Sequence, residues 1–308
     1  MRHKADKLRF LVLGAAAGGG LPQWNCGCLN CNMARDPSAA LSPQTQSSLA
    51  ATLDGENWTI MNASPDIRQQ LIDNRPLSPK SLRDTPIESV IITNGDIDHI
   101  AGLLVLRESQ RFKLFTSPSV ANILGYNPIF RALNPAFVAI SAANLDHPFQ
   151  PLAGMSATLF AVPGKVPLFM ETGDLQIGIE NDLTIGVEIV VGDARAYYIP
   201  GCAQITDALA ERLDGASLVF FDGTVFSDDE MIVTGTGHKT GRRMGHIPIS
   251  GAEGSLEVLS RLNIPRKIYV HINNTNPIWR HSPERDFVLE HGFEIARDGM
   301  EVTLALDP

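Results

Sequence analysis

The sequence of 308 residues contains few cysteines, few aromatic residues and no long apolar segment. Four cysteines are too few to form the disulfide framework of a small secreted domain. No apolar run approaches the roughly 20 residues that a membrane-spanning helix requires. The net charge of −9 leaves no excess of basic residues to neutralise a phosphate backbone. We therefore expect neither a membrane protein nor a nucleic-acid-binding protein.

The first twenty residues combine basic residues with a short apolar run at 10–13, as a secretory signal would. This run is too short for the hydrophobic region of a signal peptide, and glycines follow it. A first β-strand over 8–13 accounts for the same residues. These features predict a cytoplasmic protein.

The chain does contain many β-branched apolar runs that alternate with amphipathic segments. Hydrophobic residues make up 44% of it, enough to bury a substantial core in a single domain spanning 1–308. The patterns predict strands at 8–13, 48–53, 58–62, 88–92, 157–162, 175–179, 183–191, 196–199, 217–221, 267–271 and 302–306, and helices at 65–75, 100–108, 204–213, 252–262 and 283–290. Two β-rich halves with outer helices predict an α/β protein, an αββα four-layer sandwich. The long irregular stretches at 20–47 and 223–250 are expected to carry function.

Three of the four cysteines, Cys26, Cys28 and Cys31, lie within six residues in a glycine-containing loop at 20–35. Thiols so close in sequence pair poorly as disulfides but suit a tetrahedral Zn²⁺. We expect a structural zinc ion here, with free thiols as the alternative. The fourth ligand has to come from a distant segment, and the candidates are Asn274, His281 and water.

A second metal motif follows the predicted strand at 88–92 and reads TNGDIDHIAG over residues 93–102. It resembles the His-x-His-x-Asp-His motif of the metallo-β-lactamase fold. Asp98 and His99 match that motif, whereas Asn94 and Asp96 stand where two histidines are expected. The resemblance predicts a metallo-β-lactamase-like sandwich with an altered metal site, in which Asp96 is a weak candidate ligand.

The same resemblance locates the distant ligands. It puts Lys165 or a near neighbour at the third histidine, Cys202 at the bridging aspartate and His271 at the last histidine. The first metal site is therefore lost, because a lysine there would repel a cation. The second site keeps Asp98, His99 and His271, with Cys202 as a weaker candidate. Two histidines and one carboxylate are the ligand set of non-haem Fe(II) oxygenases, so one metal is expected, with Fe(II) as the candidate.

Four runs, AGGGLPQWNCGC, TNGDIDH, GRRMGH and HINNTNP, together resemble the pyrroloquinoline quinone (PQQ) biosynthesis protein B family over essentially the whole chain. Membership implies a role in making this redox cofactor from a peptide whose glutamate and tyrosine become joined. Converting the tyrosine-derived ring to an o-quinone requires oxygen, which favours an iron-dependent hydroxylase. A non-catalytic carrier of PQQ or its precursor, aiding export, is the second hypothesis. A metal-dependent hydrolase is the third, and it is weakened by the changed ligands.

The loop at 237–246 is the one strongly basic cluster in this acidic chain. Arg242 and Arg243 are candidates for binding a polyanionic ligand, either the precursor or PQQ, because arginine can engage a carboxylate bidentately. Lys165 and Asp222 are further candidate substrate contacts, although Asp222 could instead orient a histidine and Lys165 could neutralise Asp96. His246 is a candidate acid, base or substrate contact. Carrier proteins of the same pathway and a second copy of the chain are candidate partners.

Overall fold

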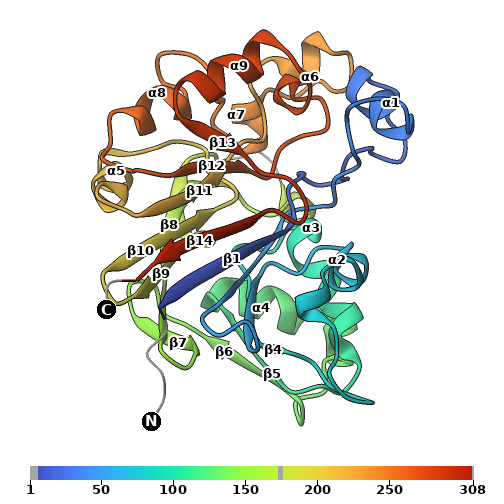
Figure 1. The fold of residues 1–308 in the computed structure, drawn as a ribbon, viewed down its shortest axis with the longest axis vertical. Helices are drawn as coiled ribbons and strands as arrows, with labels where there is room; N and C mark the ends of the chain where they lie inside the picture. The colour runs from blue at the N-terminus through green and yellow to red at the C-terminus, as the bar shows by residue number, and fades with distance from the viewer. Residues whose placement is uncertain (1–5, 173–175, 307–308) are drawn as a thin grey trace.

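Two seven-stranded sheets pack face to face in the computed structural model, which describes residues 6–172 and 176–306 (Figure 1). The first sheet has the order β14 (Glu301–Ala305), β1 (Lys7–Gly14), β2 (Ser48–Thr52), β3 (Trp58–Met61), β4 (Ile87–Ile91), β5 (Phe112–Thr116) and β6 (Val138–Ala142). The second has the order β13 (Phe293–Ile295), β12 (Lys267–Val270), β11 (Leu218–Asp222), β10 (Ala194–Ile199), β9 (Ile179–Val191), β8 (Met155–Gly164) and β7 (Pro148–Leu152).

Helices cover the outer face of each sheet, which completes the four layers (Figure 1). The half that contains the first sheet carries α2 (Ile67–Asp73), α3 (Ile97–Ile100) and α4 (Pro118–Tyr126), and α1 (Leu29–Arg35) lies in the cysteine loop. The other half carries α5 (Asp207–Leu213), α6 (Glu230–Val233), α7 (Gly241–Met244), α8 (Ser255–Ser260) and α9 (Pro283–Glu290). Short 3₁₀ helices occur at η1 (Arg75–Leu77), η2 (Ala101–Arg107), η3 (Pro128–Ala132), η4 (Leu168–Met170) and η5 (Pro277–Trp279). This architecture confirms the predicted αββα sandwich.

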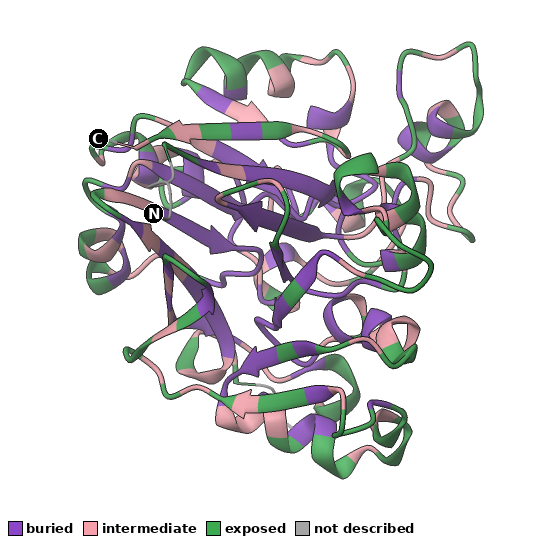
Figure 2. Cartoon of the chain, turned by 60° about the horizontal axis from the view of Figure 1, so that its bottom comes forward, coloured by how far each residue is buried: buried purple, intermediate pink, exposed green. Residues whose placement is uncertain are grey.

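The buried residues of β1 show how alternation along a strand builds the layers. Leu11 and Leu13 pack in the cluster with the residues of α2 and α4, whereas Phe10 and Val12 pack in the cluster between the sheets. Phe10 meets Phe220 of β11 edge to face, with ring centroids 5.3 Å apart. The strands at the centre of the sandwich are accordingly the most buried part of the molecule (Figure 2).

The functional loops follow strands that run parallel to their neighbours. In the first sheet β3, β4 and β5 are parallel, and in the second β10, β11 and β12 are parallel. Carboxyl ends of parallel strands meet at one edge of a sheet. The loops after β4, β11 and β12 therefore converge at one end of the sandwich.

Several predicted elements differ from the structure. The helix expected at 100–108 is the short α3 followed by the 3₁₀ helix η2. Of the strand expected at 175–179, residue 175 lies outside the described residues, 176–178 are irregular and the strand begins at Ile179. The strands β5, β6, β7 and β13 and the helices α1, α4, α6 and α7 were not predicted. Within 6–172 and 176–306, no helix is long and apolar enough to cross a membrane.

Candidate metal centre

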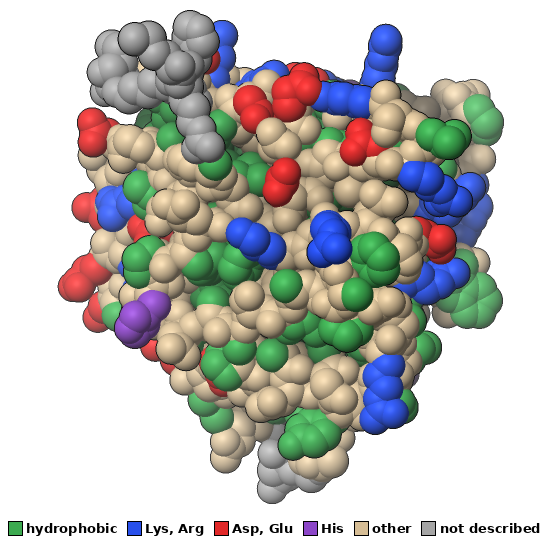
Figure 3. Space-filling view, turned by 90° about the horizontal axis from the view of Figure 1, so that it is seen from below, with side chains coloured by type: hydrophobic (Ala, Val, Ile, Leu, Met, Phe, Trp, Pro, Cys, Tyr) green, Lys and Arg blue, Asp and Glu red, His purple; other side chains and the backbone are tan. Residues whose placement is uncertain are grey.

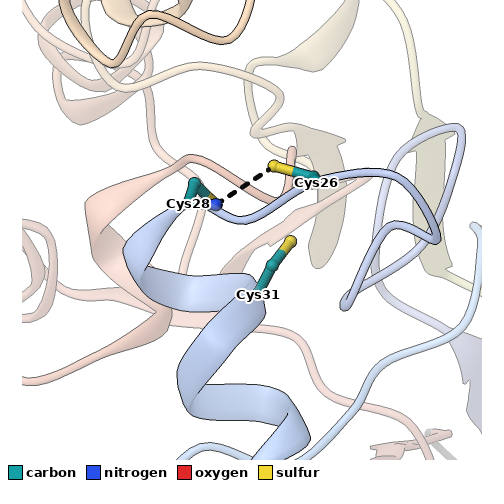
Figure 4. Close-up of side chains that lie close together, drawn as sticks. All are labelled: Cys26, Cys28 and Cys31. Carbon is teal, nitrogen blue, oxygen red and sulfur yellow. Dashed lines mark hydrogen bonds between the residues drawn. The ribbon is translucent and has the colours of Figure 1, made fainter.

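The cysteine loop forms the first of three groups of candidate metal-binding side chains among the described residues. The ligand atoms of Cys26, Cys28 and Cys31 lie within 4.8 Å of one another, and Figure 4 shows the three side chains gathered around a common point. The N–H of Cys28 donates to Sγ of Cys26 at 3.4 Å. Burial raises the pKa of Cys28 to about 11, and a bound Zn²⁺ would offset that rise by stabilising the thiolate.

Asn274 is the polar side chain that reaches this group from the far end of the sequence. Its amide nitrogen lies 3.2 Å from Sγ of Cys26, 3.2 Å from Sγ of Cys31 and 3.6 Å from Sγ of Cys28. Rotating the amide by 180° exchanges its nitrogen and oxygen, so the same side chain can offer an oxygen to a cation. His281, the other candidate residue, is not part of the group found among the described residues.

The second group joins the two halves of the sandwich. Asp98 and His99 lie in α3, shortly after β4, and His271 directly follows β12. Nε2 of His271 lies 3.1 Å from Oδ2 of Asp98, and Nε2 of His99 lies 3.5 Å from the same oxygen. Ligand atoms that share one Zn²⁺-sized ion at about 2.0–2.2 Å are separated by roughly 2.9–3.5 Å. The spacing therefore fits a single metal ion.

The state of these side chains also fits a metal. Nε2 of His99 is the one buried side-chain polar atom among the described residues that has no hydrogen-bond partner, and an unpaired buried nitrogen costs about 1–3 kcal/mol. Burial lowers the pKa of His99 and so favours the neutral form that binds metals. Burial alone would raise the pKa of Asp98, but the charges of His99 and His271 hold it well below its usual range. Burial would lower the pKa of His271, but its hydrogen bond to Asp98 and the charge of that carboxylate raise it. One carboxylate and two imidazoles, with the His271 proton displaced on binding, are a ligand set that suits a divalent cation.

The residues at the lost metal site have taken up structural roles. Oδ1 of Asn94 accepts the N–H of Asp96 at 2.9 Å, and Oδ1 of Asp96 accepts the N–H of Leu168 at 3.0 Å. The ammonium of Lys165 lies 2.9 Å from Oε1 of Glu171. Asp96 therefore lies outside the metal-binding groups of the described residues. Lys165 pairs with the carboxylate of Glu171 and not with that of Asp96.

The third group, Asp222, His246 and His271, shares His271 with the triad formed by Asp98, His99 and His271. Oδ2 of Asp222 lies 2.7 Å from Nδ1 of His246, and the His246 ring stacks on the His271 ring with centroids 5.2 Å apart. Burial would raise the pKa of Asp222, but the charge of His246 and its hydrogen bond lower it. Asp222 is fully buried. This contact orients His246, which is the alternative role predicted for Asp222 from the sequence.

Cys202 corrects the prediction of a further metal ligand. Its Sγ donates to the carbonyl oxygen of Gln204 at 3.1 Å, and the residue belongs to none of the three candidate metal-binding groups of the described residues. Burial and the charge of Asp222 raise the pKa of this thiol well above its usual value. The hydrogen bond to Gln204 thus directs this thiol away from the groups of candidate ligands.

The predicted basic residues are paired with carboxylates. The guanidinium of Arg242 lies 3.5 Å from the carboxylate of Glu253. The guanidinium of Arg243 lies 3.8 Å from a different carboxylate, that of Glu171. Lys239 lies 3.7 Å from Glu171. Arg243, Lys239 and Lys165 thus share Glu171, and we call these four residues the basic rim.

Sequence reasoning missed three polar residues of the site. Glu171 carries no motif, so only the fold brings it to the basic rim. Thr93 opens the TNGDIDH run, and Thr224 follows the strand-ending Asp222 by two residues. Both threonine hydroxyls contact metal-site histidines. Their position beside ligands at strand ends was the available signal.

The fold places the chain in the beta-lactamase superfamily, and its side-chain clusters are candidate metal sites. A family model described as a beta-lactamase superfamily domain matches residues 57–272. The structure of a diphosphatase from the PhnP family aligns with a TM-score of 0.70 at 20% identity, over 98% of this chain and 99% of that one. At this identity the likeness shows the fold alone.

Relatives of higher identity narrow the class to one family. The coenzyme PQQ synthesis protein B of Rhizobium meliloti (strain 1021) is 64% identical over 98% of this chain and its own full length. The protein of the same name from Ruegeria pomeroyi is 54% identical over 96% of this chain and its full length. The crystal structure of Zn²⁺-bound PqqB from Methylobacterium extorquens aligns with a TM-score of 0.94 at 46% identity, over 96% of this chain and 100% of that one. The chain belongs to the coenzyme PQQ synthesis protein B family.

Proposed function

We propose that this protein acts in PQQ synthesis as a mononuclear Fe(II)-dependent oxygenase that hydroxylates the tyrosine-derived ring of the peptide precursor. Family membership supports the pathway. The observation that carries the reaction is the triad of Asp98, His99 and His271, in which the buried Nε2 of His99 lacks any other partner. Zn²⁺ bound by the three cysteines would stabilise the fold of the cysteine loop and take no part in the reaction.

The three triad residues would hold Fe(II), which when bound would supply the activation of O₂. The protein's own part is to position the ring and to move a proton. Because Nδ1 of His246 is engaged with Asp222, its Nε2 remains available. We assign His246 as the base that takes the phenol proton of the substrate ring at Nε2.

The basic rim would orient the precursor through its carboxylates. Arg243 and Lys239 are each partly exposed, with 43% and 44% of their side chains accessible. Their distances to Glu171, 3.8 and 3.7 Å, leave donors available for a ligand. A ligand with several carboxylates would gain charge-assisted hydrogen bonds there.

The hydroxylation replaces one ring C–H by C–OH with one atom of O₂, and the other atom leaves as water. It consumes two protons and two electrons, which an added reductant such as ascorbate provides. The test uses zinc-replete full-length protein loaded with one equivalent of Fe(II), a cross-linked glutamate–tyrosine precursor and ¹⁸O₂. We expect one labelled oxygen in the product by mass spectrometry.

His271→Ala should abolish the labelling, whereas the exposed His147→Ala, which is remote from the triad in its contacts, should retain it. Fully iron-loaded protein that takes up no label would overturn the oxygenase assignment. If such protein still bound the finished quinone tightly, a carrier role would replace it, because the basic rim suits both ligands. Hydrolysis would require a second metal ion, which metal stoichiometry detects.

A further inference from the structure

His99 and His271, the two histidines of the triad, have similar hydrogen-bond partners on the ring nitrogen that faces away from the metal position. Each offers Nε2 to the triad, and each has Nδ1 against a buried threonine hydroxyl. Nδ1 of His271 lies 2.8 Å from Oγ1 of Thr224, and Nδ1 of His99 lies 3.3 Å from Oγ1 of Thr93. Thr224 is 4% and Thr93 is 1% exposed, so water does not compete for these contacts.

The hydrogen bonds around Thr224 can be assigned by counting protons. Its hydroxyl has one proton, and its shortest contact is Oδ1 of Asp222 at 2.6 Å. The ionised carboxylate can only accept, so the hydroxyl donates to it. Oγ1 of Thr224 is then an acceptor for Nδ1 of His271, which must carry the proton. The neighbouring Nδ1 of His246 donates to the other carboxylate oxygen, Oδ2, at 2.7 Å.

Thr93 is held in a comparable way by the amide of Asn62. Oδ1 of Asn62 lies 3.1 Å from Oγ1 of Thr93, and Nδ2 of Asn62 lies 2.9 Å from it. Nδ2 of Asn62 donates to the Thr93 hydroxyl, the hydroxyl donates to the amide oxygen of Asn62, and one lone pair is left to accept a proton from Nδ1 of His99. Asn62 is fully buried, and its amide oxygen also accepts the N–H of Thr93. Asn62 therefore orients the hydroxyl of Thr93 from the side away from the metal position.

The backbone at His271 gives Thr224 a second point of contact. His271 has φ +54°, in the left-handed region that residues with a side chain rarely adopt. The N–H of Asn273, two residues after His271, donates to the carbonyl oxygen of Thr224 at 3.0 Å. Thr224 thus contacts both the ring of His271 and the backbone that follows it.

We propose that Thr224 and Thr93 are positioning residues that hold His271 and His99 as Nδ1–H tautomers, so that both present an Nε2 lone pair to one metal ion. The proposal rests on the metal-binding part of the proposed function and not on its oxygen chemistry. Partners of this kind typically change metal affinity roughly 10- to 100-fold when they are removed.

The first test reads the tautomers directly in the unsubstituted protein, with zinc in the cysteine loop. Long-range ¹H–¹⁵N spectra of the imidazole rings should show His99 and His271 protonated at Nδ1 and not at Nε2 after one equivalent of diamagnetic Zn²⁺ is added to the triad. Nε2–H tautomers for both rings in the zinc-loaded spectrum would overturn the proposal, whether or not any variant folds.

The second test measures Co²⁺ affinity at the triad by competition with a chelator. Thr224→Val and Thr93→Val should each weaken binding roughly 10- to 100-fold, and Thr224→Ser and Thr93→Ser should restore it to within about threefold, because serine keeps the hydroxyl. Thr59→Val is the matched control, since Thr59 is equally buried but bonds only the Ser89 hydroxyl. Thermal unfolding separates lost affinity from lost folding.

Unchanged Co²⁺ affinity in both valine variants would contradict the proposal, as would serine variants as weak as the valine ones. The outcome is independent of oxygen chemistry. A protein that fails to hydroxylate the precursor but shows these tautomers and affinities would refute the oxygenase and retain the two threonines as positioning residues.

Discussion

At the scale of single residues, the absence of a side chain at Gly18 allows the N-terminal loop to lie close to Asp98 of the triad. A Cβ added there would lie 3.3 Å from Oδ2 and 3.4 Å from Cγ of Asp98. Asp98 would have to move by a few tenths of an ångström, and metal sites tolerate little displacement of a ligand. Gly18→Ala should therefore weaken metal binding at the triad several-fold, as measured by chelator competition.

Gly125→Ala provides the control for this substitution, because a Cβ at Gly125 meets nothing within 4 Å. Gly125 lies in α4, where alanine is the better helix former, so the Gly125→Ala variant should be as stable as the wild type or more stable. Equal metal affinities in the two variants would show that the loop yields without disturbing Asp98.

A second residue-scale prediction concerns Glu230, which is only 4% exposed. Burial raises the pKa of its carboxyl from 4.5 to about 7, although hydrogen bonds from Thr275 and the N–H of Phe226 oppose the rise. The folded state then binds the proton more tightly than the unfolded state. This contribution to stability is full below pH 4.5 and is lost as the pH rises through 7.

Glu230→Gln removes this titration and keeps a neutral polar group. Between pH 4.5 and 8 the wild type should lose on the order of 3 kcal/mol of unfolding free energy relative to the variant. Denaturant unfolding at a series of pH values measures the difference. Glu253→Gln, at an 87% exposed side chain, should leave the pH profile unchanged. Parallel profiles for wild type and Glu230→Gln would show that Glu230 does not titrate in this range.

At the scale of elements, the loop 271–276 connects the triad with the cysteine group. His271 belongs to the triad, and Asn274, three residues later, faces the cysteines. Asn30 of α1 donates to the carbonyl oxygens of Asn274 at 2.9 Å and of Asn276 at 2.8 Å. The cysteine loop therefore supports the backbone that carries a triad ligand.

This connection predicts that zinc at the cysteines affects the second metal site. Cys31→Ser should lose the structural zinc and also lower metal affinity at the triad, because the loop 271–276 loses its support. Metal analysis and chelator competition measure the two effects. Cys202→Ser is the control, since its thiol lies outside both groups, and it should retain zinc and triad affinity. Full triad affinity in zinc-free Cys31→Ser would show that the loop is held by its other contacts.

The elements that could be predicted from sequence were those with a strong local signal. The strands at 88–92 and 267–271 are apolar and β-branched, and they became β4 and β12, which carry the triad. The edge strand β6 has an exposed middle, with no clean alternation to reveal it. The 3₁₀ helix η2 forms where Gly102 packs against the carbonyls of Ala63 and Ser64, a tertiary contact that sequence periodicity does not encode.

The residues of the site likewise fall into those with a local sequence signal and those without one. Asp98, His99 and His271 could be predicted because each stands at a strand end within a motif. The misplacement of Cys202 arose because position in a family pattern does not report where a thiol points. The partners of Lys165 could not be predicted, because Glu171 reaches it only through the fold of the segment after β8.

At the scale of the whole molecule, an acidic protein has to bind an acidic ligand if the proposed function holds. The net charge is −9, and Figure 3 shows one face on which Lys and Arg side chains lie scattered among acidic and neutral ones. Long-range attraction of a polyanion is therefore weak, and binding depends on local charge. The basic rim provides it, but Glu171 neutralises part of that charge.

Replacing Glu171 by glutamine should consequently strengthen binding of a tricarboxylate ligand. Lys165, Lys239 and Arg243 would lose their shared carboxylate and become available to the ligand's own carboxylates. We expect a several-fold lower Kd for PQQ at low ionic strength, measured by fluorescence titration, and a smaller gain at high salt because screening weakens these partly exposed pairs. Glu253→Gln, which frees only Arg242, should change the Kd little. Weaker binding by Glu171→Gln would mean that Glu171 holds the rim in its binding geometry, and that its ordering role outweighs the charge it removes.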